Sequence, residues 1–167
     1  MKIKTSIIKT DGPKEIERKF KVSKLPENLE AFPKNEIRQG YISIEDNGIE
    51  IRIRQKNERY FKTIKSGTGV VRNEIETSIS KNKFEKLWNE TYGKNLEKTR
   101  YEIKLDDGNL AELDVYKGPL KGLIVVEVEF TNENKANDFL PPNWFGEDVS
   151  ENQNYKNSSL AVKGNPK

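Results

Sequence analysis

Charged and apolar side chains alternate with a period of two along most of this 167-residue chain. After the turn signal Asp-Asn-Gly at residues 46–48, for example, Glu50, Arg52 and Arg54 alternate with Ile51 and Ile53. Successive side chains of a β-strand point to opposite faces, so this pattern is typical of strands with one polar and one apolar face. The alternation therefore predicts a mainly β protein built from antiparallel hairpins.

Eight segments carry this alternation, and turn signals and a few helical stretches join them. We expect strands at residues 15–20, 39–44, 49–54, 60–65, 71–79, 98–105, 112–115 and 123–130. Apolar residues at helical spacing predict helices at 80–93 and 133–140, with shorter pieces at 26–32 and 155–162. Residues 1–13 end at the turn signal Asp-Gly-Pro and form a lead-in, so one domain is expected over residues 14–167.

The residue types that are missing restrict the chemistry. The chain has no cysteine and no histidine, which excludes disulfides, thiolate or histidine metal sites, and catalysis of the Ser-His-Asp or Cys-His kind. Charged residues (34%) balance apolar ones (33%), yet the aromatic and branched aliphatic residues in periodic runs argue against disorder. No segment approaches the roughly 18 consecutive apolar residues of a membrane helix. We expect a soluble, cytoplasmic protein whose chemistry uses carboxylates, Lys, Arg and Tyr.

Both signs of charge are grouped on the polar faces of the predicted strands. For a single pair such as Arg52 and Arg54, a solvent-exposed sheet face is the simpler explanation. Nearly every strand repeats the pattern, which favours polar faces that turn inward and close into a barrel, with helices on the apolar outside. Oligophosphates require several Arg and Lys donors, and hard cations require carboxylate oxygens. Such an interior predicts a site where a metal ion bridges protein and phosphate.

The segment Glu-Ile-Glu-Arg-Lys at residues 15–19 resembles the Glu-x-Glu-x-Lys signature of the CYTH family, the triphosphate tunnel metalloenzymes. Its Glu15 and Glu17 share one strand face, about 6.6 Å apart along the chain, where they can bind one metal ion or two. Further segments resemble the family in the same order, at residues 39–41, 52–54, 63–65, 72–76, 97–101, 112–115, 126–129 and 144–157. The short bacterial members that act on inorganic tripolyphosphate are the most similar.

The resemblance implies an eight-stranded closed antiparallel β-barrel, a tunnel that holds a triphosphate along its axis and carries a few helices outside. It also implies hydrolysis of the terminal phosphoanhydride with one or two Mg²⁺ or Mn²⁺ ions. The implied phosphate-binding residues are Arg52, Arg54, Lys65, Arg72, Lys98 and Arg100. The implied metal ligands are Glu15, Glu17, Glu76, Asp114, Glu127 and Glu129. The implied catalytic pair near the scissile phosphate is Lys19 and Tyr41.

Several structural alternatives stay open. The acidic residues can instead form ion pairs with the bases inside the barrel, and Tyr41 can be an aromatic residue at the rim. Of Glu74 and Glu76, which share a face, we favour Glu76 as the metal ligand. Strand parity further places Gln39, Tyr41 and Ser43 on one common face, and Arg18 and Lys62 on the outer face.

The functional alternatives are an adenylate cyclase or a thiamine or nucleoside triphosphatase on the same fold, and a polyphosphate-binding protein without catalysis. Nucleic acid is not expected as a partner, because the bases alternate with carboxylates on the same faces and no aromatic stacking platform is evident. We also expect no membrane partner, and either a monomer or a homodimer.

Overall fold

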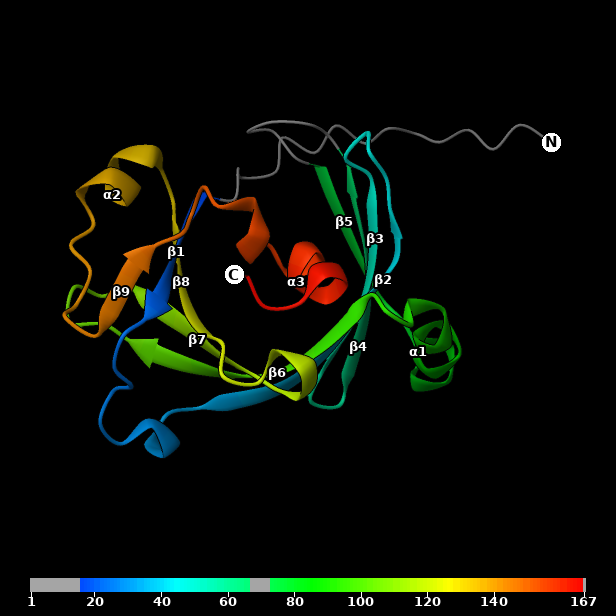
Figure 1. Cartoon of the computed structure of the whole chain (residues 1–167), viewed down its shortest axis with the longest axis horizontal. Coiled ribbons are helices and arrows are strands. Elements are labelled where there is room, and N and C mark those ends of the chain that lie inside the picture. Colours follow the sequence, from blue (N-terminus) through cyan, green and yellow to red (C-terminus); the bar gives the residue numbers. More distant parts are fainter. Residues whose placement is uncertain (1–15, 67–72, 167) are drawn as a thin grey trace.

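A computed structural model describes residues 16–66 and 73–166 of the chain. In these residues the strands form one nine-stranded antiparallel sheet in the order β5-β4-β3-β2-β6-β7-β8-β1-β9 (Figure 1). The strands are β1 (Ile16–Val22), β2 (Lys34–Ile44), β3 (Glu50–Lys56), β4 (Arg59–Ser66), β5 (Asn73–Ser78), β6 (Asn95–Lys104), β7 (Leu110–Tyr116), β8 (Ile124–Phe130) and β9 (Phe145–Asp148). The predicted lead-in at residues 1–13 lies outside the described residues.

The described residues also contain three α-helices and four short 3₁₀ turns. These are α1 (Lys81–Trp88), α2 (Glu133–Asp138) and α3 (Asn157–Lys163), with 3₁₀ turns at Leu29–Ala31, Asn89–Thr91, Gly118–Leu120 and Gln153–Tyr155. The helices expected at 80–93, 133–140 and 155–162 are thereby confirmed, whereas the stretch 26–32 holds only a 3₁₀ turn. None of the helices in this part of the chain has the length and apolar character needed to cross a membrane.

Capping side chains explain where α1 and α2 begin. Ser80 Oγ accepts a hydrogen bond from the backbone N–H of Lys83 at 3.1 Å, and Asn132 Oδ1 accepts one from Lys135 at 2.8 Å. Each cap satisfies one of the backbone donors that a helix leaves unpaired in its first turn.

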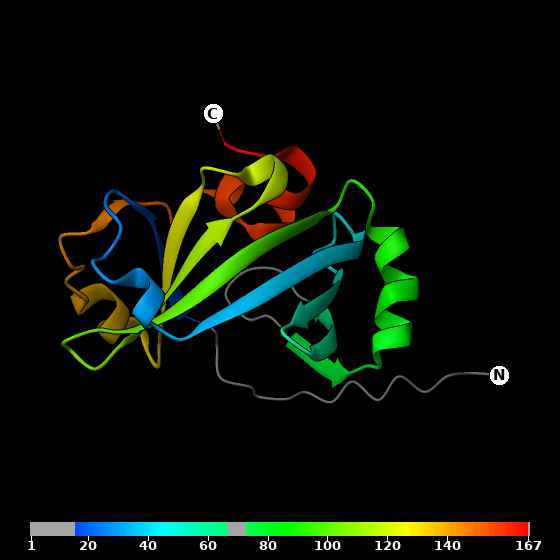
Figure 2. The same cartoon turned by 90° about the horizontal axis from the view of Figure 1, so that it is seen from below.

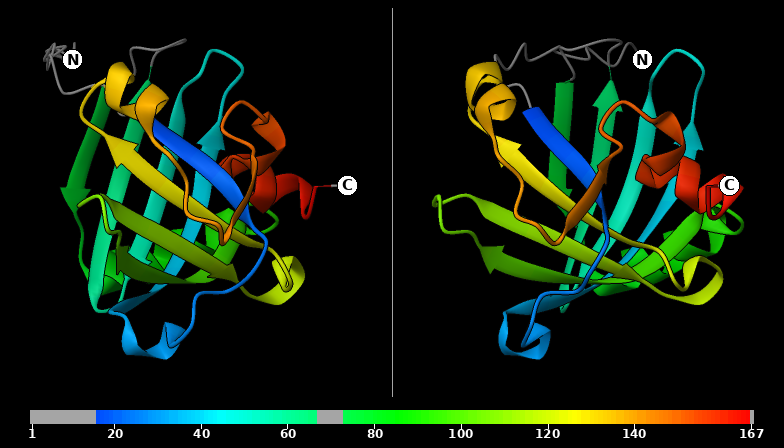
Figure 3. Two further views of the ribbon diagram at one scale, coloured as in Figure 1. Left: turned by 90° about the vertical axis from the view of Figure 1, so that its left-hand side faces the viewer. Right: turned by 60° about the vertical axis from the view of Figure 1, so that its left-hand side comes forward.

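The sheet curls around α3, which gives it a concave and a convex face (Figures 1 and 3). The predicted mainly β, antiparallel fold is confirmed, with two differences. There are nine strands rather than eight, and in the described residues no ladder joins the two edges β5 and β9, so the barrel is not closed by hydrogen bonds. The ninth strand is β9, which pairs with the edge of β1, where Phe20 faces Asp148.

The two longest strands, β2 and β6, run side by side across the molecule and carry the centre of the concave face (Figure 2). Ile37 of β2 faces Lys98 of β6, and on its other side β2 pairs with β3 so that Tyr41 faces Arg52. The register then shifts, and Ser43 faces Ile51. The expectation that Ser43 shares the face of Tyr41 is therefore wrong, because a β-bulge between them reverses the parity.

The main hydrophobic core lies on the convex face. It joins side chains of β1, β6, β7 and β8, such as Phe20, Leu113 and Val126, to Phe139 and Phe145, which lie beyond α2. On the other half of the sheet, α1 packs Phe84 against β4, with ring centroids of Phe84 and Tyr60 5.1 Å apart. The positions of α1 and α2 confirm that helices cover the apolar outside of the sheet, whereas α3 lies on the concave side.

A second apolar cluster fills one end of the concave face, where the sequence predicted only charge. Leu96, Tyr116 and Val125 of the sheet pack there against Leu160 of α3 and Tyr155 of the preceding turn. The helix reaches this position because the chain after β9 crosses back over the sheet (Figure 1). The interior is therefore divided into an apolar end under α3 and a charged remainder.

Gly40 of β2 lies where the sheet meets the 3₁₀ turn Asn89–Thr91. A Cβ at position 40 would lie 2.6 Å from Thr91 Cβ. Thr91 is fully buried, and its Oγ1 donates to Trp88 O at 2.7 Å and accepts from Asn95 Nδ2 at 3.1 Å, so it cannot easily move.

We therefore expect Gly40→Ala to lower the free energy of unfolding by about 1–3 kcal/mol, the usual cost of overpacking. Urea denaturation of the variant and the wild type would measure the difference. An unchanged midpoint would show that Thr91 and its turn can shift after all.

Candidate functional site

The concave face holds a polar cavity of about 270 Å³. Among the described residues that line it, only Ile37 is apolar, and bases and acids are nearly equal in number. The bases are Arg52, Arg54, Lys56, Lys65, Lys98 and Arg100, the acids are Glu17, Glu74, Glu112, Glu127 and Glu129, and Gln39 and Asn157 complete the lining. The mixed-sign interior inferred from strand parity is thus present.

Arg52 and Arg54 bring two guanidinium groups to one wall of this cavity. Arg52 Nη2 donates to Thr63 Oγ1 at 3.3 Å, and the Nη2 atoms of both arginines lie 3.6 Å from Glu76 Oε2. The Nε atoms of both arginines are buried and find no hydrogen-bond partner among the described residues. Burial, and then the charge of Arg52, lowers the pKa of Arg54. Unused buried donors of like charge favour an anionic ligand, which would satisfy them.

A buried network holds the bases of β6. Asp114 has no exposed surface, and Lys98 only 1%. Asp114 Oδ2 lies 2.8 Å from Lys98 Nζ, while Arg100 binds the same carboxylate in bidentate fashion, with Nε 2.8 Å from Oδ1 and Nη2 2.9 Å from Oδ2. Arg100 Nη1 also reaches Glu112 Oε2 at 3.1 Å.

The network sets the charge state of its members. Burial lowers the pKa of Lys98 to about 8, although Asp114 opposes the shift. Burial would raise the pKa of Asp114, but Arg100 and Lys98 outweigh it and hold that pKa below its usual range. Asp114 is therefore an ionised counterion for both bases. It is not among the residues that line the cavity, and its assignment as a metal ligand stays a prediction.

The acidic wall is built where β1 pairs with β8. Lys19 faces Glu127 and Glu17 faces Glu129 across the two strands. Lys19 Nζ lies 3.1 Å from Glu127 Oε1 and donates to Tyr155 O at 2.8 Å. Burial would raise the pKa of Glu127, but the positive charge of Lys19 leads the opposing effects that lower it, so this carboxylate stays ionised.

The donor chemistry of this wall fits a hard divalent cation, since Glu17, Glu127 and Glu129 offer only carboxylate oxygens to the cavity. Within residues 16–66 and 73–166, however, no three acidic side chains stand close enough together to hold a metal ion as they are. Glu15, a further predicted ligand, lies outside the described residues. Metal binding by this set therefore stays a prediction.

The predicted catalytic pair is buried beside the cavity rather than in its lining. Lys19 is held by Glu127 and Tyr155, as described above. Tyr41 Oη accepts a hydrogen bond from Gln39 Nε2 at 3.2 Å, and burial raises the pKa of Tyr41 to about 12. We expected Lys19 and Tyr41 to lie close together, but their side chains form no hydrogen bond with each other. Their catalytic roles stay predictions.

Most of the other predicted residues are brought together. The cavity lining contains Glu17, Arg52, Arg54, Lys65, Lys98, Arg100, Glu127 and Glu129. Arg72 lies outside the described residues. Glu76, which we favoured over Glu74, accepts a hydrogen bond from Thr63 Oγ1 at 2.9 Å, whereas Glu74 is the one that lines the cavity.

Five polar residues of the lining had no assigned role in the predicted site. Strand parity had already placed Gln39, Glu74 and Glu112 on the polar face, and it could have added Lys56, which stands two positions after Arg54. Asn157 gave no such signal. It begins α3, and its Oδ1 accepts from Tyr116 Oη at 2.6 Å and from Lys98 Nζ at 3.4 Å.

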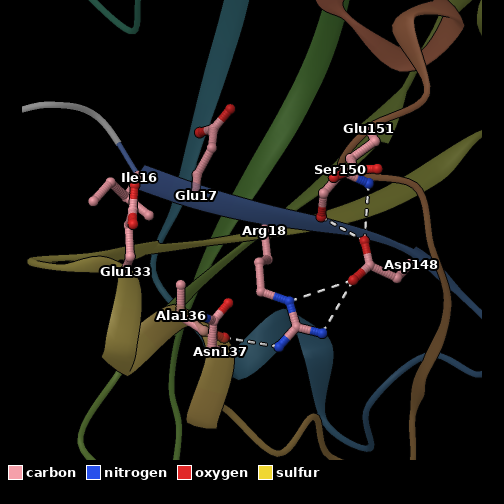
Figure 4. A pocket seen from close by; sticks show the side chains of 9 residues that line it. All are labelled: Ile16, Glu17, Arg18, Glu133, Ala136, Asn137, Asp148, Ser150 and Glu151. Carbon is pink, nitrogen blue, oxygen red and sulfur yellow. Dashed lines mark hydrogen bonds and ion pairs between the residues drawn. The ribbon is translucent and has the colours of Figure 1, made fainter. Parts of the chain in front are cut away.

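A second, more open hollow of about 600 Å³ lies on the other side of β1, between β9 and α2 (Figure 4). Arg18 points into it, away from Glu17, and binds Asp148 Oδ2 at 3.0 Å and the carbonyl oxygen of Ala136 at 2.9 Å. These contacts confirm that Arg18 belongs to the outer face. Its donors tie β1 to β9 and α2, which is a structural role.

Comparison with known proteins identifies relatives along nearly the whole chain. Residues 13–161 match the CYTH domain. An inorganic triphosphatase of Nitrosomonas europaea is 50% identical over 149 residues, which are 89% of this chain and 97% of that protein. An inorganic triphosphatase of Acetivibrio thermocellus is 33% identical over 150 residues, 88% of this chain and 92% of that protein.

Solved structures agree. The crystal structure of an inorganic triphosphatase superposes with a TM-score of 0.72 at 47% identity, covering 89% of this chain and 94% of that one. A putative adenylyl cyclase from Hippeastrum, described as having a dominant triphosphatase activity, superposes with a TM-score of 0.54 at 15% identity, covering 74% of this chain and 82% of that one. At that identity the second likeness concerns the fold alone.

Proposed function

The chain belongs to the CYTH family, and on that premise we propose that it hydrolyses inorganic tripolyphosphate to pyrophosphate and phosphate. The observation that carries the proposal is the cavity wall of Arg52 and Arg54, whose buried Nε donors have no partner among the described residues. Relatives described as inorganic triphosphatases cover nearly the whole chain and support the same reaction.

The composition of the cavity favours an inorganic chain over a nucleotide. Ligand pockets for drug-sized molecules usually measure about 300–1,000 Å³ and are lined mostly by apolar and aromatic side chains. This cavity measures about 270 Å³, and no aromatic residue is among the described residues that line it. A nucleobase or a thiazole ring would find no stacking partner there, whereas phosphate oxygens would meet six basic side chains.

We infer that Glu17, Glu127 and Glu129, together with Glu15, hold one or two Mg²⁺ or Mn²⁺ ions on the opposite wall. Such an ion supplies Lewis-acid stabilisation of the phosphoanhydride and lowers the pKa of water. The protein's own part is positioning and charge. Arg52, Arg54, Lys65, Lys98 and Arg100 bind and orient the phosphates and neutralise the charge that develops on the leaving pyrophosphate.

Phosphate release tests the proposal. Purified protein should release phosphate from tripolyphosphate faster than from ATP, thiamine triphosphate or pyrophosphate when Mg²⁺ or Mn²⁺ is present. EDTA should abolish the release, and added metal should restore it. Cyclic AMP formed from ATP would identify a cyclase instead, and tight binding of tripolyphosphate without any turnover would identify a binding protein.

A further inference from the structure

Gln39 and Tyr41 stand two positions apart on the concave face of β2, and the amide of Gln39 donates to the Tyr41 hydroxyl at 3.2 Å. We propose that Gln39 is a positioning residue of the triphosphatase. The Gln39 amide holds the Tyr41 hydroxyl so that the hydroxyl proton is free to bind an oxygen of the bound triphosphate. The inference rests on the proposed function and adds a role that the sequence did not assign to Gln39.

The direction of the hydrogen bond carries the argument. An amide N–H can only donate, so Tyr41 Oη is the acceptor and its own proton remains available for another oxygen. Among the described residues, the Tyr41 hydroxyl forms no other hydrogen bond. A hydroxyl whose lone pair is fixed by a buried neighbour has its remaining proton restricted to few directions, which is what preorganised hydrogen bonding to a substrate requires.

The surroundings keep both groups in these roles. Gln39 is 1% exposed and Tyr41 3%, so water does not compete for the bond between them. Burial raises the pKa of Tyr41 to about 12, which keeps the phenol protonated at neutral pH. Tyr41 is therefore suited to donate a hydrogen bond rather than to act as a base.

The register of β2 against β3 places the pair beside the phosphate-binding wall. Gln39 faces Arg54 and Tyr41 faces Arg52. Gln39 lines the cavity itself, and its amide lies 3.2 Å from the Tyr41 hydroxyl, so the hydroxyl adjoins the wall of the space that the phosphates would occupy. A triphosphate held by the two arginines would thus lie next to the Gln39–Tyr41 hydrogen bond.

A double-mutant cycle with tripolyphosphate as substrate tests the inference. Gln39→Leu should lower kcat about tenfold, as expected for the loss of one orienting hydrogen bond, and Tyr41→Phe should lower it at least as much. Because Gln39 acts through the Tyr41 hydroxyl, adding Gln39→Leu to Tyr41→Phe should cause no further loss of kcat. Gln39→Glu has nearly the same shape but accepts the Tyr41 proton, and should reduce kcat as far as Tyr41→Phe does.

A matched control lies on the outer face. Gln55 of β3 donates to Tyr60 Oη at 3.4 Å outside the cavity, so Gln55→Leu should leave kcat unchanged. Thermal denaturation of each variant checks that it is folded. The positioning role alone would be overturned if Gln39→Leu kept the wild-type kcat. It would also be overturned if Gln39→Leu lowered kcat equally in the wild type and in Tyr41→Phe. A wild-type protein that hydrolyses no triphosphate would overturn the proposed function and this inference with it.

Discussion

Asp114→Asn should lower the free energy of unfolding by about 3–5 kcal/mol, the usual effect of removing one partner from a buried ion pair. The substitution keeps the shape of the side chain but removes the charge that Arg100 and Lys98 share. Lys98 can then lose its proton, since burial already lowers its pKa to about 8, but the guanidinium of Arg100 stays charged. Urea denaturation at neutral pH measures the loss.

The exposed ion pair between Arg18 and Asp148 supplies the matched control. Asp148→Asn removes the same kind of contact at the surface, where an ion pair contributes no more than about 1 kcal/mol. Equal losses from both variants would contradict the role of the buried network.

Acid pH provides a second check on the same carboxylate. The pKa of Asp114 is lower in the folded protein than the ordinary 3.8, so its contribution to stability is fully present above pH 3.8 and is lost as the pH falls through the folded value. The difference in stability between wild type and Asp114→Asn should therefore shrink in strong acid.

Glu129→Gln should reduce the rate of tripolyphosphate hydrolysis by about 10²- to 10³-fold while the protein stays folded, a loss typical of removing one group that stabilises a charged transition state. The side chain lines the cavity at its acidic wall, opposite Glu17, and is exposed, so the fold does not depend on its charge. Steady-state kinetics with saturating Mg²⁺ measure the loss, and circular dichroism confirms the fold.

Glu151→Gln is the control for this variant, because Glu151 lines the outer hollow and not the charged cavity. It should keep wild-type activity. Full activity in Glu129→Gln would contradict the assignment of this carboxylate to a metal ion.

Strand parity predicted which side chains meet in the interior, because a period of two assigns every strand residue to one face. It could not predict how deeply each of these side chains is buried. Asp114 and Glu129 both lie on the concave side, yet one is fully buried under two bases and the other is exposed to the cavity. The burial of a side chain depends on how far the neighbouring strands and α3 cover it. Those contacts join segments that are distant in the sequence.

Parity also failed where the chain departs from regular pairing. The bulge after Tyr41 places Ser43 on the other face, and no local sequence pattern indicated a bulge there. The strand β9 has only four residues, too few for a periodic signal. The apolar end of the interior was missed because Leu96 and Tyr116 lie just outside the strands expected at 98–105 and 112–115, and because Leu160 packs on them from a segment distant in the sequence.

The pairing of β1 with β8 also has a consequence for how the chain folds. Ile16 faces Phe130 and Glu17 faces Glu129, so the first described strand meets a partner more than 100 residues later in the chain. Closing so long a loop is entropically costly, and contacts of this kind slow folding. During synthesis β1 must remain without this partner until residue 130 has left the ribosome. The acidic wall is therefore among the last parts to assemble, and a truncated chain would lack it however well β2 to β7 had formed.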